Sequence, residues 1–560
     1  MINNSNSLVS GNPEFASREI AALAKSEGYL AAWRTLIGTG GKEAMRDVSG
    51  DFSVGFFDTA GCAFLAVDRF AIRSLCYQVI DGELRFAARA DELADSTSEI
   101  DPQAIFDYLY FHVIPSPRTI FKGIFRLPPG HCAVFENGSL SVSPYWVPEF
   151  NELQKPSPTD LRTEFRQLLR DAVARQLDGG KPGCFLSGGT DSSTVAGMIG
   201  EVSGQQTATY SIGFEAEGYD EMEYARIAAR HFKTEHHEYY VTPDDLVRSI
   251  SAVAQYYDQP FGNSSALPAY YCAKMAREDG VGKILAGDGG DELFGGNTRY
   301  AKQKIFGYYD SLPALFRNTL LEPLLLKTAL GRLPLARKGV SYIEQAKTPL
   351  PDRSQIYNML FRLGIHQVFE PDFLDLVDIN GPIAQQRAVW NSALADSQTN
   401  RELAFDWRYT LAECDLPKVV GTTALAGINV GFPLLDKALV DFSTKLPTSY
   451  KLNGLNLRWF FKEALRGFLP DEILVKKKQG FGLPFGVWAA NNAKLRSLAE
   501  DSVRGLVDRN ILRQDFVDAL FNRYLYEHPG YYGEMIWISM ILEQWLRRDL
   551  TVADCCVGGS

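Results

Sequence analysis

A short apolar run that starts at Cys184 leads into a loop whose residue types suit the binding of a phosphate group. The loop and the helix-compatible segment behind it carry small residues, hydroxyls and one acid, in the order Leu186, Ser187, Gly188, Gly189, Thr190, Asp191, Ser192 and Ser193. Glycine lets the backbone approach an anion closely, and a helix start offers unpaired N–H groups and the positive end of its dipole. Asp191 would repel a phosphate unless a cation lay between them, so we predict a Mg²⁺ ion there.

A second glycine-rich loop, Ala286-Gly287-Asp288-Gly289-Gly290-Asp291-Glu292, collects carboxylates at the end of another apolar run. Taken alone, acids in a glycine-rich loop could simply belong to a solvent-exposed turn. These acids, however, follow a strand of the same sheet that carries the phosphate loop, so they are better explained as a site for a cation and a substrate. Ligands of parallel sheets bind beyond the carboxyl ends of the strands, where both loops fall.

The first loop resembles the pyrophosphatase-type (PP) loop of ligases that split ATP and release pyrophosphate. Asparagine, GMP and NAD synthetases and tRNA-thiolating enzymes share this loop, which differs from the lysine-containing Walker loop. The second loop is very similar to the second nucleotide motif of asparagine synthetases, which GMP and NAD synthetases lack. The chain therefore resembles the asparagine synthetase family, from about residue 50 to about residue 545.

The resemblance implies a role for particular side chains. The positions implied to contact ATP are Leu186, Ser187, Gly188, Gly189, Asp191, Ser192, Ser193, Ile212, Ala286, Gly287 and Lys476. Asp191 and Asp291 would hold Mg²⁺ on the pyrophosphate. Asp288 would be a catalytic acid linked to forming the acyl-adenylate and receiving the amine, where the family usually has the longer glutamate.

A lysine triplet, Lys476 to Lys478, would ordinarily be a solvated loop. In the family, the lysine that matches Lys478 faces the reacting phosphate and carbonyl, so Lys478 is the second predicted catalytic residue. A cation is wanted there because negative charge builds on the pyrophosphate and on the tetrahedral oxyanion.

Two parts of the chain depart from the family pattern. Asn429 and Gly431 stand where the family has an acid and an arginine, so the identity of the carboxylate substrate stays open. The N-terminal part resembles the second half of the glutamine-hydrolysing domain, whose nucleophile is an N-terminal cysteine. Here position 2 is Ile2 and the first cysteine is Cys62, so we expect a degenerate domain without glutaminase activity.

These observations predict an α/β fold with two domains. Residues 1–150 would form the degenerate, β-rich domain of N-terminal-nucleophile (Ntn) type, and residues 157–550 a parallel-sheet ATP pyrophosphatase domain with a helical C-terminal part. The segment Tyr145 to Pro158 would link them, because it contains three prolines. In the second domain strands alternate with helices, which favours a parallel sheet covered on both faces. In the first, we predict one helical stretch, Arg18 to Leu36, and several strands.

Composition excludes other classes of function. At 560 residues with 46% hydrophobic and 22% charged residues, the chain is an ordinary globular protein with room for a large core. The net charge of −11 argues against nucleic acid as a partner, since phosphate neutralisation needs clustered cations. We expect no membrane segment, a cytoplasmic location, small-molecule partners and a homodimer as a candidate assembly.

The expected activity is an ATP-dependent carbon–nitrogen ligation related to asparagine biosynthesis and to amidotransferases. A carboxylate, aspartate or a related acid, would be adenylated with loss of pyrophosphate, and ammonia or an amine would then displace AMP. Alternatives are a specialised amide former resembling β-lactam synthetases or lasso-peptide cyclases, and a non-catalytic nucleotide-binding regulator. Transfer of sulfur to tRNA would need a reactive cysteine near the loop, and Cys184 is expected in the core.

Overall fold

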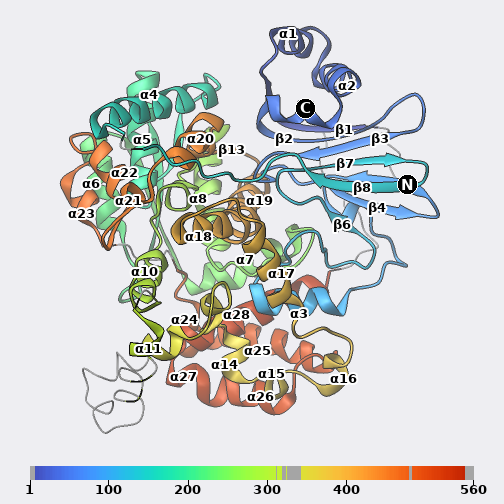
Figure 1. Ribbon diagram of the computed structural model, residues 1–560. Helices are drawn as coiled ribbons and strands as arrows, with labels where there is room; N and C mark the ends of the chain where they lie inside the picture. The colour runs from blue at the N-terminus through green and yellow to red at the C-terminus, as the bar shows by residue number, and fades with distance from the viewer. Residues whose placement is uncertain are drawn as a thin grey trace.

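The computed structural model describes residues 7–154, 156–310, 312–317, 319, 323, 342–477 and 482–548. Figure 1 shows a β-rich N-terminal part beside a larger α/β part, with a group of helices below both. The predicted fold class is therefore confirmed: a β-rich part precedes a parallel α/β sheet and a helical C-terminal part.

The N-terminal part is built on two antiparallel sheets. The larger has the strand order β1-β2-β3-β7-β8, and the smaller has the order β5-β4-β6. Their strands are β1 Ser7–Phe15, β2 Val48–Phe57, β3 Ala63–Val67, β4 Cys76–Ile80, β5 Glu83–Ala87, β6 Phe125–Arg126, β7 His131–Glu136 and β8 Ser139–Pro144. All five residues of β3 are buried, because alternate side chains face two helices on one side and the smaller sheet on the other.

Those two helices are α1 (Arg18–Glu27) and α2 (Tyr29–Gly40). The sequence predicted a single helix over this stretch, but Gly28 separates the two with a φ of 90°. A left-handed backbone of this kind favours glycine. The break lets α2 press Trp33 onto Phe52 of the larger sheet, with their ring centroids 5.0 Å apart.

The second part contains a five-stranded, fully parallel sheet with the order β11-β10-β9-β12-β13. Its strands are β9 Gly183–Phe185, β10 Ala208–Phe214, β11 Glu235–Val241, β12 Lys283–Leu285 and β13 Asn429–Gly431. The first four match strands expected from the sequence. The sequence did not predict β13, a three-residue strand that joins the sheet from more than a hundred residues further along the chain.

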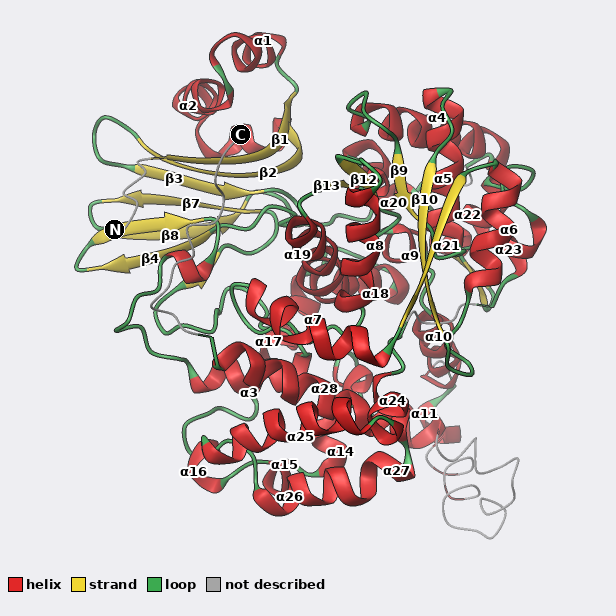
Figure 2. Cartoon of the chain, turned by 180° about the vertical axis from the view of Figure 1, so that it is seen from behind, coloured by secondary structure: helices red, strands yellow, loops and turns green. Residues whose placement is uncertain are grey.

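Helices cover both faces of this sheet (Figure 2). α5 (Thr190–Ser203) and α6 (Met222–Phe232) lie on one face, and α8 (Ala266–Glu278) lies on the other. Strands β9 and β12 are direct neighbours, with Leu285 paired to Cys184. The loops that follow them therefore leave the sheet at the same edge and side by side.

The remaining helices and short strands are α3 of the N-terminal part and the elements that surround this sheet and form the helical C-terminal part. They are α3 Pro102–Phe111, α4 Pro158–Gln176, α7 Pro243–Tyr256, α9 Gly290–Phe294, α10 Thr298–Asp310, α11 Ala314–Phe316, α14 Met359–Leu363, α15 Ile365–Val368, α16 Pro371–Leu374, α17 Gly381–Ser392, α18 Gln398–Asp406, α19 Leu416–Ala426, α20 Lys437–Lys445, α21 Thr448–Lys451, β14 Leu452–Asn453, β15 Asn456–Leu457, α22 Trp459–Ala464, α23 Asp471–Val475, α24 Phe485–Asn491, α25 Ala493–Asp508, α26 Gln514–Ala519, α27 Leu525–Glu527 and α28 Pro529–Leu546. Among the described residues, no helix combines the length and the apolar character needed to cross a membrane.

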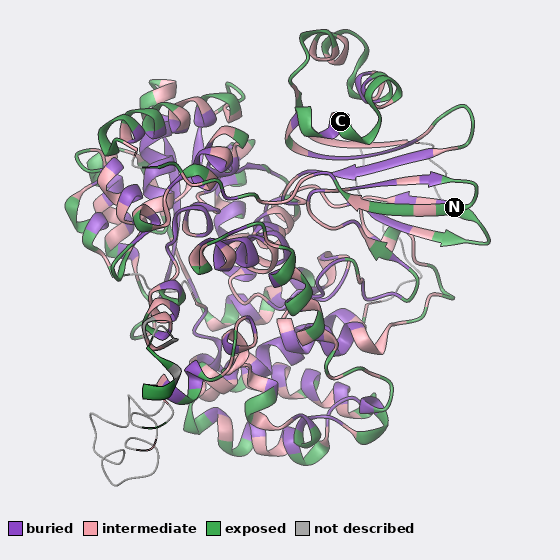
Figure 3. Ribbon diagram, viewed as in Figure 1, coloured by how far each residue is buried: buried purple, intermediate pink, exposed green. Residues whose placement is uncertain are grey.

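The two parts share a continuous buried region (Figure 3). The fully buried Tyr108 of α3 donates a hydrogen bond to the carbonyl of Ile538 in α28, at 2.9 Å. At a second contact between the two parts, the indole rings of Trp146 and Trp407 stack with their centroids 6.1 Å apart. Trp407 also donates its Nε1–H to the carbonyl of Glu292 in α9, at 2.9 Å, so the β-rich part is connected to the second glycine loop.

Candidate active site

The first glycine loop joins β9 to α5 and brings the start of that helix to the sheet edge. Gly188 has a φ of 67°, and a Cβ built on it would lie 2.4 Å from the backbone nitrogen of Ala225 in α6. Only glycine fits this close approach. α5 begins directly behind the loop, so its first N–H groups and its positive dipole end lie at the rim of the cavity described below.

The hydroxyl groups of the loop hold one another in place. Ser192 Oγ accepts a hydrogen bond from the backbone N–H of Ser187 at 3.1 Å, and the two side-chain oxygens are 3.0 Å apart. Ser187 Oγ in turn accepts from the N–H of Gly189 at 3.3 Å. Ser193 takes no part in these hydrogen bonds, and its side chain is fully buried beneath the loop.

The second glycine loop packs directly against the first. A Cβ on Gly287 would lie 2.7 Å from the backbone nitrogen of Ser192, so the absence of a side chain allows this contact. Gly289 has a φ of 100° and begins the short helix α9, which carries Asp291. The predicted meeting of the two loops is therefore present in the fold.

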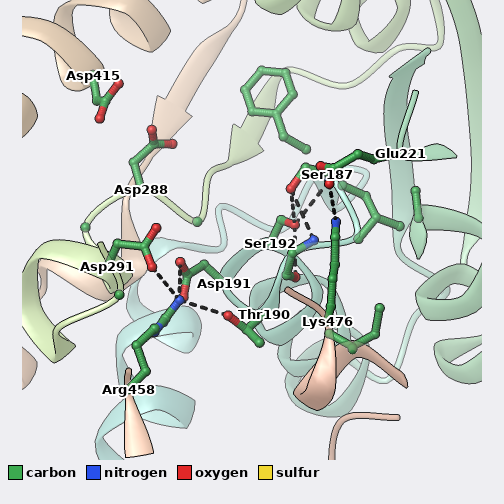
Figure 4. A pocket seen from close by; sticks show the side chains of 18 of the residues that line it. Ser187, Thr190, Asp191, Ser192, Glu221, Asp288, Asp291, Asp415, Arg458 and Lys476 are labelled. Carbon is green, nitrogen blue, oxygen red and sulfur yellow. Dashed lines mark hydrogen bonds and ion pairs between the residues drawn. The ribbon is translucent and has the colours of Figure 1, made fainter. Parts of the chain in front are cut away.

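Asp191 and Asp291 face a common point, and the guanidinium of Arg458 lies at it (Figure 4). Arg458 Nη1 donates to Asp191 Oδ2 at 2.8 Å, to Asp291 Oδ1 at 2.9 Å and to Thr190 Oγ1 at 2.8 Å. Its Nη2 contacts the other oxygen of Asp191. Burial alone would lower the pKa of Arg458, but the two carboxylates raise it above its usual value.

The two acids fit the predicted Mg²⁺ ion in their chemistry and in their surroundings. Both offer carboxylate oxygens, which are the ligands Mg²⁺ prefers. Two glycines provide the space that the two carboxylates occupy. A Cβ on Gly290 would lie 2.2 Å from Asp191 Oδ1, and a Cβ on Gly296 would collide with Asp291. The sequence analysis missed Arg458, which is an isolated cation in a stretch without a recognisable motif.

Asp288 lies further along the second loop, in a group with Lys418 and Asp415. Lys418 Nζ is 3.7 Å from Asp288 Oδ1 and 3.0 Å from Asp415 Oδ1. Burial raises the pKa of Asp288 to about 6, although the charge of Lys418 acts in the opposite direction. At neutral pH Asp288 is mostly ionised, with a proton affinity that suits exchange with a reacting amine. The sequence analysis also missed Lys418 and Asp415.

Lys476 lies on the other side of the first loop. Its Nζ is 3.2 Å from Glu221 Oε1 and donates to the carbonyl of Gly188 at 3.4 Å. Its side chain is only 8% exposed, and its ammonium group lies over the ring of Tyr224. The predicted catalytic residue Lys478 lies outside the described residues.

A cavity of about 1210 Å³ joins these groups. The predicted residues that line it are Leu186, Ser187, Gly189, Asp191, Ser192, Ile212, Gly287, Asp288, Asp291 and Lys476. Three predicted ATP contacts, Gly188, Ser193 and Ala286, are not part of this lining. Asn429 and Gly431 on β13 are not part of it either. A Cβ on Gly431 would lie 2.2 Å from Gln176 Oε1, so the family's arginine could not fit there without rearrangement.

Comparison with known proteins adds two family matches. Residues 164–547 match the asparagine synthase family, and residues 25–146 match the glutamine amidotransferase domain. The second match agrees with the Ntn-type domain expected at the N-terminus.

Similar proteins include two from bacteria and one from a fungus. Asparagine synthetase [glutamine-hydrolyzing] 1 of Bacillus subtilis is 27% identical over 448 residues, which cover 78% of this chain and 68% of that protein. A putative asparagine synthetase [glutamine-hydrolyzing] of Mycobacterium bovis is 26% identical, over 80% of this chain and 69% of the relative. Amidase chry2 of Gibberella zeae is 23% identical, over 85% of this chain and 76% of the relative.

Proposed function

Because this chain belongs to the asparagine synthase family, we propose that it is an ATP-dependent carbon–nitrogen ligase that forms an amide from a carboxylate and ammonia or an amine. One observation carries the proposal. Two glycine loops meet so closely that Asp191 and Asp291 face the same point, in a cavity that extends to Asp288. A protein that only binds a nucleotide would not need Asp288 at the far end of this cavity.

In the first half-reaction, an oxygen of the carboxylate substrate attacks the α-phosphate of ATP. The bond between that phosphorus and the oxygen bridging to the β-phosphate breaks, and pyrophosphate leaves with an acyl-adenylate remaining. The N-terminus of α5 and the Ser187 and Ser192 hydroxyls would bind the phosphates. Mg²⁺ held by Asp191 and Asp291 would supply positive charge for the pyrophosphate, and Lys478 remains a predicted second source.

In the second half-reaction, ammonia or an amine attacks the acyl carbon and AMP leaves. The attacking nitrogen must lose a proton, and Asp288, with its pKa of about 6, is the group we assign to accept it. Lys418 would hold this carboxylate in position, because its ammonium group lies between Asp288 and Asp415.

The proposed nitrogen source is free ammonia or an amine, with no hydrolysis of glutamine. Among the described cysteines of the β-rich part, Cys76 and Cys132 are buried and the pKa of the Cys62 thiol is raised, which disfavours a thiolate nucleophile. Aspartate is the first acid to test. Because Asn429 and Gly431 stand where the family has a charge pair, related acids are to be tested beside it. Because the reaction consumes ATP, we propose that it takes place in the cytoplasm.

The test is exchange of labelled pyrophosphate into ATP, with aspartate and then a panel of other carboxylates. Exchange that depends on one acid is expected, with an amide product seen by mass spectrometry once ammonia or an amine is added. Exchange with none of the acids, together with measurable ATP binding, would favour the non-catalytic regulator. Turnover supported by glutamine alone would contradict the proposed nitrogen source.

A further inference from the structure

Arg458 occupies the point at which Asp191 and Asp291 would hold a metal ion. Its side chain is 6% exposed and its guanidinium contacts both acids and Thr190. The same guanidinium lies 4.0 Å from the ring centroid of Phe461, so it is fixed from two sides. Among the described residues, this arginine is the cation that joins the two glycine loops.

A guanidinium and a divalent cation cannot share this point. Both would require the same carboxylate oxygens, and two positive charges at contact distance repel each other strongly in a partly buried site. Metal binding between the two acids therefore requires Arg458 to move away. The reverse also holds, since the guanidinium returns when the metal leaves.

The backbone and side chain of Arg458 allow such a movement. The residue lies between the short strand β15 and helix α22, with a φ of 56°. Its side chain has four rotatable bonds and lines the same cavity as the phosphate-binding loop. Its Nε is buried and has no acceptor among the described residues, so the observed position leaves one of its donors unused. A polyphosphate in the cavity would offer acceptors for all of its donors, in the fork geometry that arginine prefers.

We propose that Arg458 is a polyphosphate-binding residue that, in the unliganded protein, takes the place of the metal ion between Asp191 and Asp291. The nucleotide gives the guanidinium a new partner, and the acids then become available to Mg²⁺. Metal and nucleotide consequently bind cooperatively, and the metal alone binds weakly. This inference deepens the proposed function, because it rests on ATP and Mg²⁺ as the ligands of this cavity.

The test measures binding of Mn²⁺ alone to the full chain, from the electron paramagnetic resonance signal of the free ion. Arg458→Met should bind Mn²⁺ at least about tenfold more tightly than the wild type, because the competing cation is gone. Arg458→Lys should be intermediate, since an ammonium group lacks the fork. Arg466→Met is the matched control. Arg466 is 59% exposed and pairs with Glu463, so Mn²⁺ should bind this variant as it binds the wild type.

Equal Mn²⁺ dissociation constants in the wild type and in the Arg458 variants would overturn the inference. The same holds if Asp291→Asn, added to an Arg458 variant, leaves the tighter binding unchanged. If Arg458→Met does not fold, the comparison of Arg458→Lys with the wild type decides. The assay contains no carboxylate, amine or ATP, so its failure is distinguishable from a failure of the ligase activity.

Discussion

Replacing Asp288 by asparagine should separate the two half-reactions. Asparagine has nearly the same shape but cannot accept a proton from an attacking amine. Exchange of pyrophosphate into ATP should stay within a few-fold of the wild type, because the phosphate-binding groups are untouched. Amide formation should fall by about two to three orders of magnitude, the usual loss when a general base is removed.

The same substitution should make the protein more stable, by an amount that depends on pH. The pKa of Asp288 is raised from 3.8 to about 6 in the folded chain, so its ionised form destabilises that state once the pH exceeds the unfolded value. By linkage, the cost is about 3 kcal/mol at pH 8 and about half of that at pH 5, and it disappears at lower pH. The uncharged amide of the variant would not carry this cost, so the gain in stability should be larger at pH 8.

Chemical denaturation followed by tryptophan fluorescence, at pH 8 and at pH 5, measures this difference. The reference is the wild type, measured at the same two pH values. An equal stability change for Asp288→Asn at both pH values would refute the reasoning about its burial. At a constant concentration of the unprotonated amine, amide formation by the wild type should also fall by half near pH 6. A rate independent of pH down to 5 under this condition would refute Asp288 as the base.

Three further predictions concern the loops and the nitrogen source. Asp191→Asn should lower pyrophosphate exchange by about a hundredfold or more, without changing the carboxylate dependence, because it removes a metal ligand; a few-fold loss would contradict the metal role. Gly188→Ala should destabilise the chain by about 2 kcal/mol or more and weaken ATP binding, because its Cβ would collide with the backbone of Ala225. The control is Gly204→Ala, where φ is a similar 65° but no atom lies within 4 Å of the added Cβ. This control should cost about 1 kcal/mol of stability in chemical denaturation. Glutamine should not replace ammonia, so no glutamate should appear during turnover, and stoichiometric glutamate would show an active glutaminase.

The sequence predicted the features of the site that are local. Each glycine loop carries its acids within a few residues and follows an apolar run, so one short segment reveals both the turn and its chemistry. The alternation of strands with helices between residues 183 and 285 predicted the parallel sheet, but it did not predict that β9 and β12 are neighbours. The assignment of individual side chains to ATP, to Mg²⁺ and to catalysis stays a prediction.

The sequence could not reveal the groups that arrive from far along the chain. Arg458 lies 267 residues from Asp191, and Lys418 lies in a helix without a recognisable motif. Only the fold brings these cations to the acids. Strand β13 was missed for a similar reason, because three residues give too little periodicity to indicate a strand.

The connection from Trp146 through Trp407 to Glu292 gives the β-rich part a task that does not depend on a nucleophilic cysteine. Deleting that part would strip α28 of its partner Tyr108 and take away the support behind the acidic helix α9. The β-rich part is therefore a scaffold for the acidic helix and for the C-terminal helices, whatever chemistry it performs itself.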